Sequence, residues 1–193
     1  MNYPIIEIFD SVQGEGSWLG IPATFIRFAG CNLQCAWCDT KQSWGKGTPM
    51  AVEEIAKQIH YSTVILTGGE PTLYDLDAFI AGLREILPQT TTITFAIETN
   101  GTNPVPSVID WVVCSPKPDV DYIIRCDPDE LKYVVDEIFS VDVIPARFRG
   151  SIPIWLQPNA MDLTVSQKKC YSLVMEHPDL RLGLQLHKIY NIQ

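Results

Sequence analysis

The sequence has no long hydrophobic run and no excess of basic residues, and these absences exclude several classes of protein. No apolar stretch approaches the roughly 20 residues that cross a bilayer. The first ten residues, MNYPIIEIFD, are acidic where a signal peptide needs positive charge. With 14 lysines and arginines against 23 aspartates and glutamates, the net charge of -9 repels a phosphate backbone. We therefore expect a cytoplasmic protein that binds neither nucleic acid nor a membrane.

Internal repeats, low-complexity stretches and shifts in composition are also absent from the sequence. Its 193 residues are 46% hydrophobic, which is enough for one sizeable core. We expect a single domain over residues 1–193.

Short apolar runs, separated by glycine and proline, predict strands that alternate with helices. Buried strands are expected at residues 23–29, 63–67, 93–98, 109–114, 131–135, 152–157 and 180–186. The run at 131–135 fits a helix equally well. Helix start signals precede three segments: Thr48 with Pro49 before 50–60, Asp75 before 76–87, and Thr164 with Gln167 before 168–177.

This alternation favours parallel strands joined by right-handed crossovers, which close toward a barrel. A complete eight-fold barrel takes about 250 residues, and the middle of this chain passes from strand to strand without a helix. We therefore predict an α/β fold, a partial TIM-like barrel of about six mainly parallel strands and about three main helices. Its site should lie at the C-terminal ends of the strands.

Three cysteines stand together in the run GCNLQCAWCDT, directly after the strand expected at 23–29. The spacing C-x3-C-x2-C lets Cys31, Cys35 and Cys38 reach one metal centre. Three thiolates on a [4Fe-4S] cluster leave one iron open, and S-adenosylmethionine (SAM) can chelate that iron. A redox Cys35–Cys38 pair would not explain Cys31. A structural zinc site would need a fourth ligand brought in by the fold, from His60, His177 or His187.

A second turn supports the same interpretation. The sequence GGEP, residues 68–71, follows the strand expected at 63–67. Its glycines let backbone groups approach a ligand, and Glu70 adds an anion. Together the cysteine motif and this turn resemble the radical SAM superfamily, in which the turn binds the methionyl amino group of SAM.

The flanking motifs narrow the resemblance. The runs FDSVQGEGSWLGIPATFIRFAGCNLQCAWCDT, LTGGEPTLY, IETNGT, CSPK and ELKYVVD follow one another over most of the chain. They resemble the 7-carboxy-7-deazaguanine synthase family, radical SAM enzymes of the 7-deazapurine (queuosine) pathway. The resemblance implies hydrogen abstraction from C6 of 6-carboxy-5,6,7,8-tetrahydropterin, ring contraction and loss of ammonia. It also implies the [4Fe-4S] cluster, regenerated SAM and Mg2+ as cofactors, with no catalytic side chain.

The resemblance assigns residues to each ligand. Thr40 of the CDT motif is the candidate Mg2+ ligand. SAM is expected to contact Gly69, Glu70, Glu98, Ser115, Pro116, Lys117, Gln157, Pro158 and Asn159. The pterin is expected to contact Val12, Gln13, Gly14, Glu15, Arg27, Thr67, His187 and the terminal Gln193.

The chemistry of several residues agrees with these roles. A pterin carboxylate calls for a fixed, charged fork, and Arg27 lies in the apolar strand that enters the cysteine loop. An ordinary surface ion pair is the alternative for Arg27. Residues 12–16 offer amide, carboxylate and backbone groups to a planar heterocycle, although a turn without a ligand is equally compatible.

The remaining cysteines and the tryptophans have simpler interpretations. Cys114, Cys126 and Cys170 are expected to be buried thiols. Three tryptophans near the cysteine loop either shield the cluster or pack in the core: Trp18, Trp37 and Trp44.

Besides the pterin, we expect an electron donor of the flavodoxin or ferredoxin type, and a homodimer. Two other functions stay open on the residues alone. One is a radical SAM activase that generates a glycyl radical on a partner protein. The other is a non-catalytic zinc-binding module.

Overall fold

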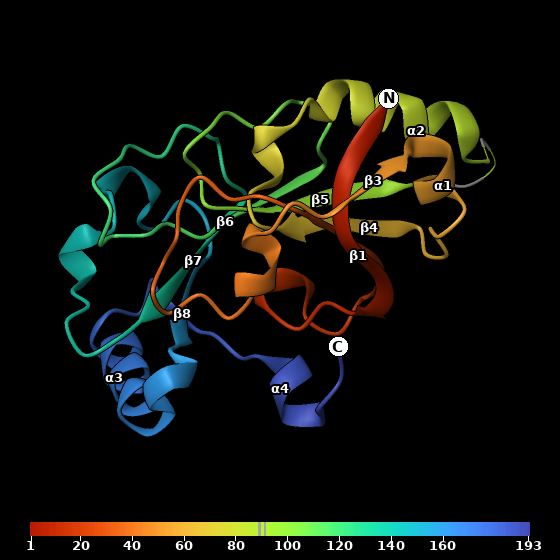
Figure 1. Cartoon of the computed structure of the whole chain (residues 1–193). Helices are drawn as coiled ribbons and strands as arrows, with labels where there is room; N and C mark the ends of the chain where they lie inside the picture. The colour runs from red at the N-terminus through yellow and green to blue at the C-terminus, as the bar shows by residue number, and fades with distance from the viewer. Residues whose placement is uncertain (89, 91) are drawn as a thin grey trace.

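One open sheet runs through the chain (Figure 1). The computed structural model describes residues 1–88, 90 and 92–193. Within these residues the strand order is β3-β1-β2-β4-β5-β6-β7-β8-β9, and the edge strands β3 and β9 do not pair with each other. The strands are β1 (Asn2–Val12), β2 (Pro22–Phe28), β3 (Thr48–Ala51), β4 (Thr63–Gly68), β5 (Thr94–Thr99), β6 (Trp111–Cys114), β7 (Glu130–Val135), β8 (Ile154–Pro158) and β9 (Arg181–Leu182).

Most of the sheet is parallel, as the alternating pattern predicts. Each neighbouring pair from β2 through β4 to β9 is parallel, whereas β1 is antiparallel to both β2 and β3. The predicted partial barrel is confirmed. The antiparallel edge formed by β1 and β3 was not predicted, because the burial of β1 does not alternate regularly along its length.

Four α-helices accompany the strands in the described part of the chain: α1 (Val52–Ala56), α2 (Leu76–Ile86), α3 (Leu163–Glu176) and α4 (Leu186–Tyr190). Helices α1 and α2 lie side by side, and α3 lies beside β8 (Figure 1). The predicted start of α2 is confirmed, since the Asp75 carboxylate accepts a hydrogen bond of 3.0 Å from the Ala78 N–H. Its apolar residues recur at helical spacing and are buried: Leu76, Phe79, Ile80 and Leu83.

Two predicted helix starts are wrong. Thr48 and Pro49 belong to strand β3, where they pair with Ile5 and Pro4 of β1, and the helix begins only at Val52. There the Ala51 N–H donates to the Glu54 carboxylate at 3.0 Å, so Glu54 caps the helix instead of Thr48. Helix α3 begins at Leu163, which places Thr164 and Gln167 inside the helix.

Two strand predictions also needed the tertiary structure. Residues 131–135 form a strand and not a helix, because nearly all of β7 is buried between its neighbours. The strand expected at 180–186 shortens to the two residues of β9, after which Leu186 donates its N–H to the Gly14 carbonyl at 2.9 Å. That bond turns the chain toward residues 13–16, and His187 therefore lies in α4 and not at a strand end.

Side chains that alternate along each strand give the sheet an apolar core face and a polar face. The large apolar cluster includes the buried side of α2 and one residue each from β2, β4, β5, β7 and β8: Ile26, Leu66, Ile97, Leu131 and Leu156. Because side chains alternate along a strand, the next residues point the other way. These residues are Arg27, Thr67, Glu98, Lys132 and Gln157. Four of them stand one residue before the C-terminal end of their strands, where the parallel sheet presents its loops, whereas Lys132 lies in the middle of β7.

No helix in the described residues is long and apolar enough to cross a bilayer.

Candidate active site

A cavity of about 300 Å³ lies at the C-terminal ends of the parallel strands. All five polar residues of the inner face line it: Arg27, Thr67, Glu98, Lys132 and Gln157. It also takes in residues 12–15, the cysteine loop, Ser115, Lys117 and the segment around His187. Residues from both ends of the chain thus meet in one cavity.

The cysteine loop is docked on the turn that follows β4. Glu70 donates its backbone N–H to the Gly30 carbonyl at 2.8 Å, and the Gly69 N–H bonds the Phe28 carbonyl at 3.1 Å. A Cβ on Gly69 would collide with the Gly30 carbonyl oxygen, so only glycine permits this approach. The two motifs found in the sequence therefore form one unit.

All three cysteines of the motif are half-buried and line the cavity: Cys31, Cys35 and Cys38. Burial raises the pKa of the Cys31 and Cys35 thiols. Among the residues that the structure describes, no three His, Cys, Asp or Glu side chains converge closely enough to hold a single metal ion. A [4Fe-4S] cluster takes one thiolate per iron and so needs its cysteines further apart. The three soft donors on one loop fit that cluster.

Glu70 is fully buried and does not line the cavity. Its carboxylate accepts hydrogen bonds from the Thr72 N–H (3.0 Å), the Thr72 hydroxyl (2.6 Å), the Thr99 hydroxyl (2.7 Å) and the Asn100 N–H (2.7 Å). These bonds tie the turn to the end of β5. Gly69 is the residue of this turn that faces the cavity together with Gly68.

At the β1 side of the cavity, Arg27 Nε donates to Glu7 Oε1 at 2.8 Å. The end of the chain lies beside this pair: Gln193 Nε2 donates to Glu7 Oε2 at 2.8 Å, and the Ser11 hydroxyl donates to the Gln193 carbonyl. Sequence reasoning missed Glu7, because the strand that carries it gave no clear signal. The contacts place Arg27 and Gln193 at the same wall of the cavity.

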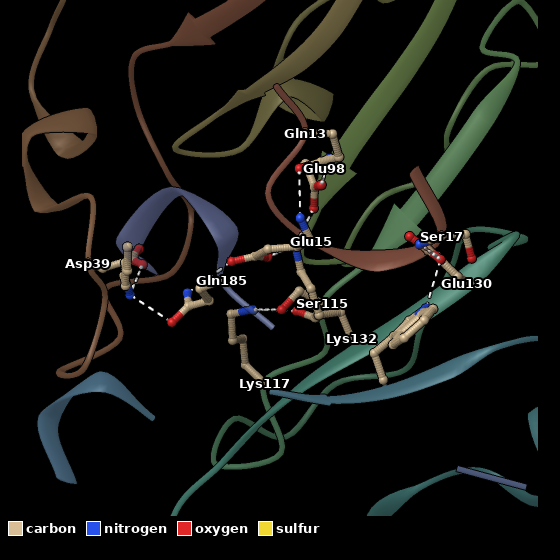
Figure 2. Close-up of polar contacts among 12 residues, drawn as sticks. Gln13, Glu15, Ser17, Asp39, Glu98, Ser115, Lys117, Glu130, Lys132 and Gln185 are labelled. Atoms are coloured by element: carbon tan, nitrogen blue, oxygen red, sulfur yellow. Dashed lines mark hydrogen bonds and ion pairs between the residues drawn. The ribbon is translucent and has the colours of Figure 1, made fainter. Parts of the chain in front are cut away.

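Lys132 is the main site residue that sequence reasoning missed. Its ammonium group lies 2.5 Å from Glu15 Oε2 and 2.8 Å from Glu98 Oε2, and its side chain is only 11% exposed (Figure 2). The signal was a lysine within an otherwise apolar strand, which is rare without a partner. Removing one member of such a buried set costs about 3–5 kcal/mol, since the others stay buried without compensation.

Burial and charge act in opposite directions on this trio. Burial raises the pKa of Glu98, and the nearby Lys132 only partly offsets that rise. Burial also pushes the pKa of Glu15 upward, but the charge and hydrogen bonds of Lys132 outweigh it and leave that pKa lowered. For Lys132, the two carboxylates outweigh burial and raise the pKa. The protein thus holds an ammonium ion between two carboxylates of unequal proton affinity.

On the opposite side, Lys117 donates to the Ser115 hydroxyl at 2.8 Å and lies 5.3 Å from the centre of the Trp37 ring. Burial lowers the pKa of Lys117. Tyr122 holds the segment in place, since its hydroxyl accepts from the Lys117 N–H and donates to the Asn100 carbonyl at 2.6 Å. Ser115 and Lys117 line the cavity, whereas Pro116 faces a neighbouring one.

Gln157 carries a buried side-chain amide that has no hydrogen-bond partner among the described residues, at either its nitrogen or its oxygen. A buried amide without partners is costly, so a ligand that offers both a donor and an acceptor fits here. Pro158 and Asn159 line the same part of the cavity.

The other predicted residues also line the cavity. Thr40 lies close to the cysteines, with its hydroxyl 3.6 Å from the Cys38 sulfur. His187 is half-buried against Gly14, and burial lowers its pKa. Further predicted residues in the lining are Val12, Gln13 and Thr67. Residues in the lining that were not predicted include Phe9, Phe25, Gln185 and Lys188.

The scattered cysteines are buried, as expected: Cys114, Cys126 and Cys170. The three tryptophans near the cysteine loop take two different positions. Trp37 and Trp44 line the cavity, whereas Trp18 stacks on Trp111 with ring centres 5.5 Å apart.

Comparisons with known proteins agree with this arrangement. The Radical SAM superfamily pattern matches residues 25–113. A 7-carboxy-7-deazaguanine synthase from Bacteroides thetaiotaomicron is 44% identical, with 100% of both chains covered. One from Synechocystis sp. is 32% identical over 100% of this chain and 95% of its own length. The crystal structure of QueE from Escherichia coli gives a TM-score of 0.77 at 27% identity, covering 97% of this chain and 95% of that chain.

The matches to the two relatives extend over the whole chain and include the flanks on which the resemblance was based. They support the resemblance to the 7-carboxy-7-deazaguanine synthases over the two functions left open by the residues, the glycyl-radical activase and the zinc-binding module. This chain belongs to the 7-carboxy-7-deazaguanine synthase family of radical SAM enzymes.

Proposed function

We propose that this chain converts 6-carboxy-5,6,7,8-tetrahydropterin into 7-carboxy-7-deazaguanine by hydrogen abstraction, ring contraction and loss of ammonia, as one domain over residues 1–193. The observation that carries the proposal is the cavity itself, in which the cysteine loop and a set of buried polar side chains face the same space. The names of the relatives support the same product.

The polar groups of the cavity suit a reduced pterin that carries a carboxylate. Arg27 offers a guanidinium to the carboxylate. Gln13 and Glu15 offer an amide and an acceptor to the amino and N–H groups along the pterin edge. Gln13 is already oriented, because its Nε2 donates to Glu98 Oε1 at 3.0 Å. The pterin would therefore lie between β2 and residues 12–15, with His187, Thr67 and Gln193 around it.

The radical SAM family implies a [4Fe-4S] cluster and SAM, and a reduced cluster supplies the electron that cleaves the sulfonium bond of SAM. Cys31, Cys35 and Cys38 would hold the cluster. Gln157 would satisfy its buried amide on SAM, and Ser115 and Lys117 would border the same ligand. Trp37 and Trp44 line the same cavity and would shield the bound cluster from bulk water.

We also propose that Thr40 binds Mg2+ through its hydroxyl, with water and substrate oxygens completing the coordination. Its place in the lining, next to the exposed Asp39, supports this role. A cytoplasmic location, a homodimer and an electron donor of the flavodoxin or ferredoxin type complete the proposal.

The test uses protein reconstituted with iron and sulfide without air, then mixed with SAM, dithionite, Mg2+ and the carboxy-tetrahydropterin. The expected result is the deazaguanine product, identified by its mass and absorbance, with SAM recovered after turnover. Cleavage of SAM without any deazaguanine would contradict the proposed substrate and favour the activase. A colourless protein that binds stoichiometric zinc would contradict the cluster itself.

A further inference from the structure

Strand β7 holds the substrate loop, residues 13–17, through two polar side chains. Glu130 and Lys132 are two residues apart on β7, so both side chains leave the same face of the sheet. Glu130 Oε2 accepts the Ser17 N–H and the Trp155 Nε1–H, each at 2.9 Å. Lys132 bonds the Glu15 carboxylate of the same loop (Figure 2).

The contacts of Lys132 reach beyond the loop. Its ammonium group also bonds Glu98 on β5, so that one side chain joins the substrate loop to a second strand. Each carboxylate is then held at its other oxygen by an amide: Gln185 donates to Glu15 Oε1 at 2.9 Å, and Gln13 donates to Glu98 Oε1 at 3.0 Å. Both carboxylates are therefore fixed at two points.

The positive charge between them is what makes this arrangement possible. Glu15 and Glu98 are 14% and 18% exposed, and both line the cavity. Two buried like charges this close repel each other, and without a cation one of them would take up a proton or move toward water. Lys132 reduces the net charge of the trio to minus one and gives both carboxylates a common partner.

We propose that Lys132 is a positioning residue for the pterin: it fixes the Glu15 and Glu98 carboxylates in the cavity so that they accept hydrogen bonds from the N–H groups of the substrate. Glu98 then faces the pterin and not SAM, the ligand to which the family resemblance assigns it, because its carboxylate bonds Gln13 and Lys132. This inference rests on the proposed function, because it concerns the same cavity. It assigns to β7 a role that neither the cysteine motif nor the SAM-binding segments supply.

Glu130 provides a matched control. It belongs to the same strand and holds the same loop, but it does not line the cavity. One oxygen of Glu130 accepts both of its hydrogen bonds, so Glu130→Gln keeps an acceptor at that position and removes only the charge. Comparing Glu130→Gln with the Lys132 variants therefore separates two effects: the loss of any buried charge on β7, and the loss of the charge that holds Glu15 and Glu98 in place.

The experiment compares wild-type holoenzyme with Lys132→Met, Lys132→Arg and Glu130→Gln. Lys132→Met should bind its full complement of iron and sulfide and should raise the KM for the pterin at least about 10-fold, with a smaller change in the KM for SAM. Lys132→Arg keeps the charge and should recover most of that loss, whereas Glu130→Gln should change the KM for the pterin less than about 3-fold. An equal loss in Lys132→Met and Lys132→Arg, or no change in the KM for the pterin, would overturn the proposal.

A second measurement does not depend on turnover. Amide hydrogen exchange in residues 13–17 should be faster in Lys132→Met than in wild type and should return toward the wild-type rate in Lys132→Arg. Unchanged exchange in Lys132→Met would refute the positioning role even if the wild-type enzyme does not act on the pterin. Failure of wild type to form product, with the exchange pattern as expected, would refute the proposed substrate and leave the arrangement of the carboxylates intact.

Should Lys132→Met not fold, Glu98→Gln tests the same arrangement from the other partner. This change neutralises the carboxylate while keeping its shape, and it should raise exchange in residues 13–17 above the wild-type rate, because Lys132 loses one of the two charges that hold it in place. If residues 13–17 of Glu98→Gln keep the same protection from exchange as wild type, the coupling through Lys132 is contradicted.

Discussion

Glu7 of β1 and Arg27 of β2 stand directly opposite each other on antiparallel strands, and their side chains form an ion pair of 2.8 Å. The pair uses Nε of the guanidinium. No described residue hydrogen-bonds the two terminal nitrogens, which leaves them for a ligand in the cavity. The register between two strands thus sets the direction in which the guanidinium points.

Replacing Arg27 should weaken pterin binding without affecting the cluster. Loss of a charge-assisted hydrogen bond costs about 1.5–3 kcal/mol, or roughly 10- to 150-fold in the KM for the pterin. Arg27→Lys keeps the charge but not the planar fork, so it should fall between wild type and Arg27→Ala. The measurements are steady-state kinetics and iron content, and loss of iron in Arg27→Ala would show that its role is structural.

Gly69→Ala should disturb the cysteine loop. The added Cβ would collide with the Gly30 carbonyl, and relieving that contact costs about 1–3 kcal/mol and moves the loop away from β4. Most of the bound iron should be lost. Gly45→Ala is the control, because its Cβ would meet only the Gln42 carbonyl at 3.4 Å, and it should change stability by less than about 0.5 kcal/mol. Normal iron content in Gly69→Ala would contradict the close packing of the two motifs.

The cysteines should divide into two groups in alkylation. In cluster-free protein at about pH 8, iodoacetamide should label the half-buried Cys31, Cys35 and Cys38 first. Burial raises the pKa of the Cys170 thiol to about 11, so Cys170 should stay unlabelled until the protein unfolds. Peptide mass spectrometry measures the labelling of each cysteine.

Substitution should divide the cysteines in the same way. Cys35→Ala should abolish cluster binding and SAM cleavage, whereas Cys170→Ala should keep the cluster and the cleavage activity. An equal effect of the two changes would contradict this division.

Thr40→Ala should weaken the dependence of turnover on Mg2+ while leaving the cluster in place. The loss of one hydroxyl ligand should reduce the apparent affinity for Mg2+ about 10-fold or more. The exposed Thr48 of β3 offers a control, since Thr48→Ala should leave the Mg2+ dependence unchanged. The measurement is product formation against Mg2+ concentration. An unaltered curve for Thr40→Ala would place the ion elsewhere.

His187 should make the folded protein less stable in mild acid. Burial holds its pKa below the ordinary value of 6.5, so the unfolded chain takes up a proton at a higher pH than the folded chain does. The stabilising contribution is therefore complete above 6.5 and is lost as the pH falls through the lowered pKa. The urea concentration at the unfolding midpoint should be measured at about pH 7.5 and at about pH 5.5. Its decrease between the two pH values should be larger in wild type than in His187→Asn. Equal drops would show that His187 titrates freely.

The inner face of the sheet shows how far sequence reasoning reaches. The apolar runs predicted the parallel strands, and the family resemblance added Arg27, Thr67, Glu98 and Gln157 as site residues, all of which line the cavity. Lys132 lay in one of these predicted strands, but its partner Glu15 is 117 positions earlier in the chain, and no local pattern connects the two. The start of α1 was misjudged for a related reason, because the pairing of β3 with β1 overrides the local helix signal of Thr48 and Pro49.

The sequence by itself determined the chemistry of this protein: the spacing of Cys31, Cys35 and Cys38 on one loop, the glycines after β4, and the strand period that turns polar side chains inward. These are local properties, since they depend on neighbours along the chain. Only the tertiary structure decided the pairing of Lys132 with Glu15 and Glu98, the pairing of Arg27 with Glu7, and the return of Gln193 to the first strand. Such contacts join distant segments, and their geometry depends on how the whole sheet curves and packs.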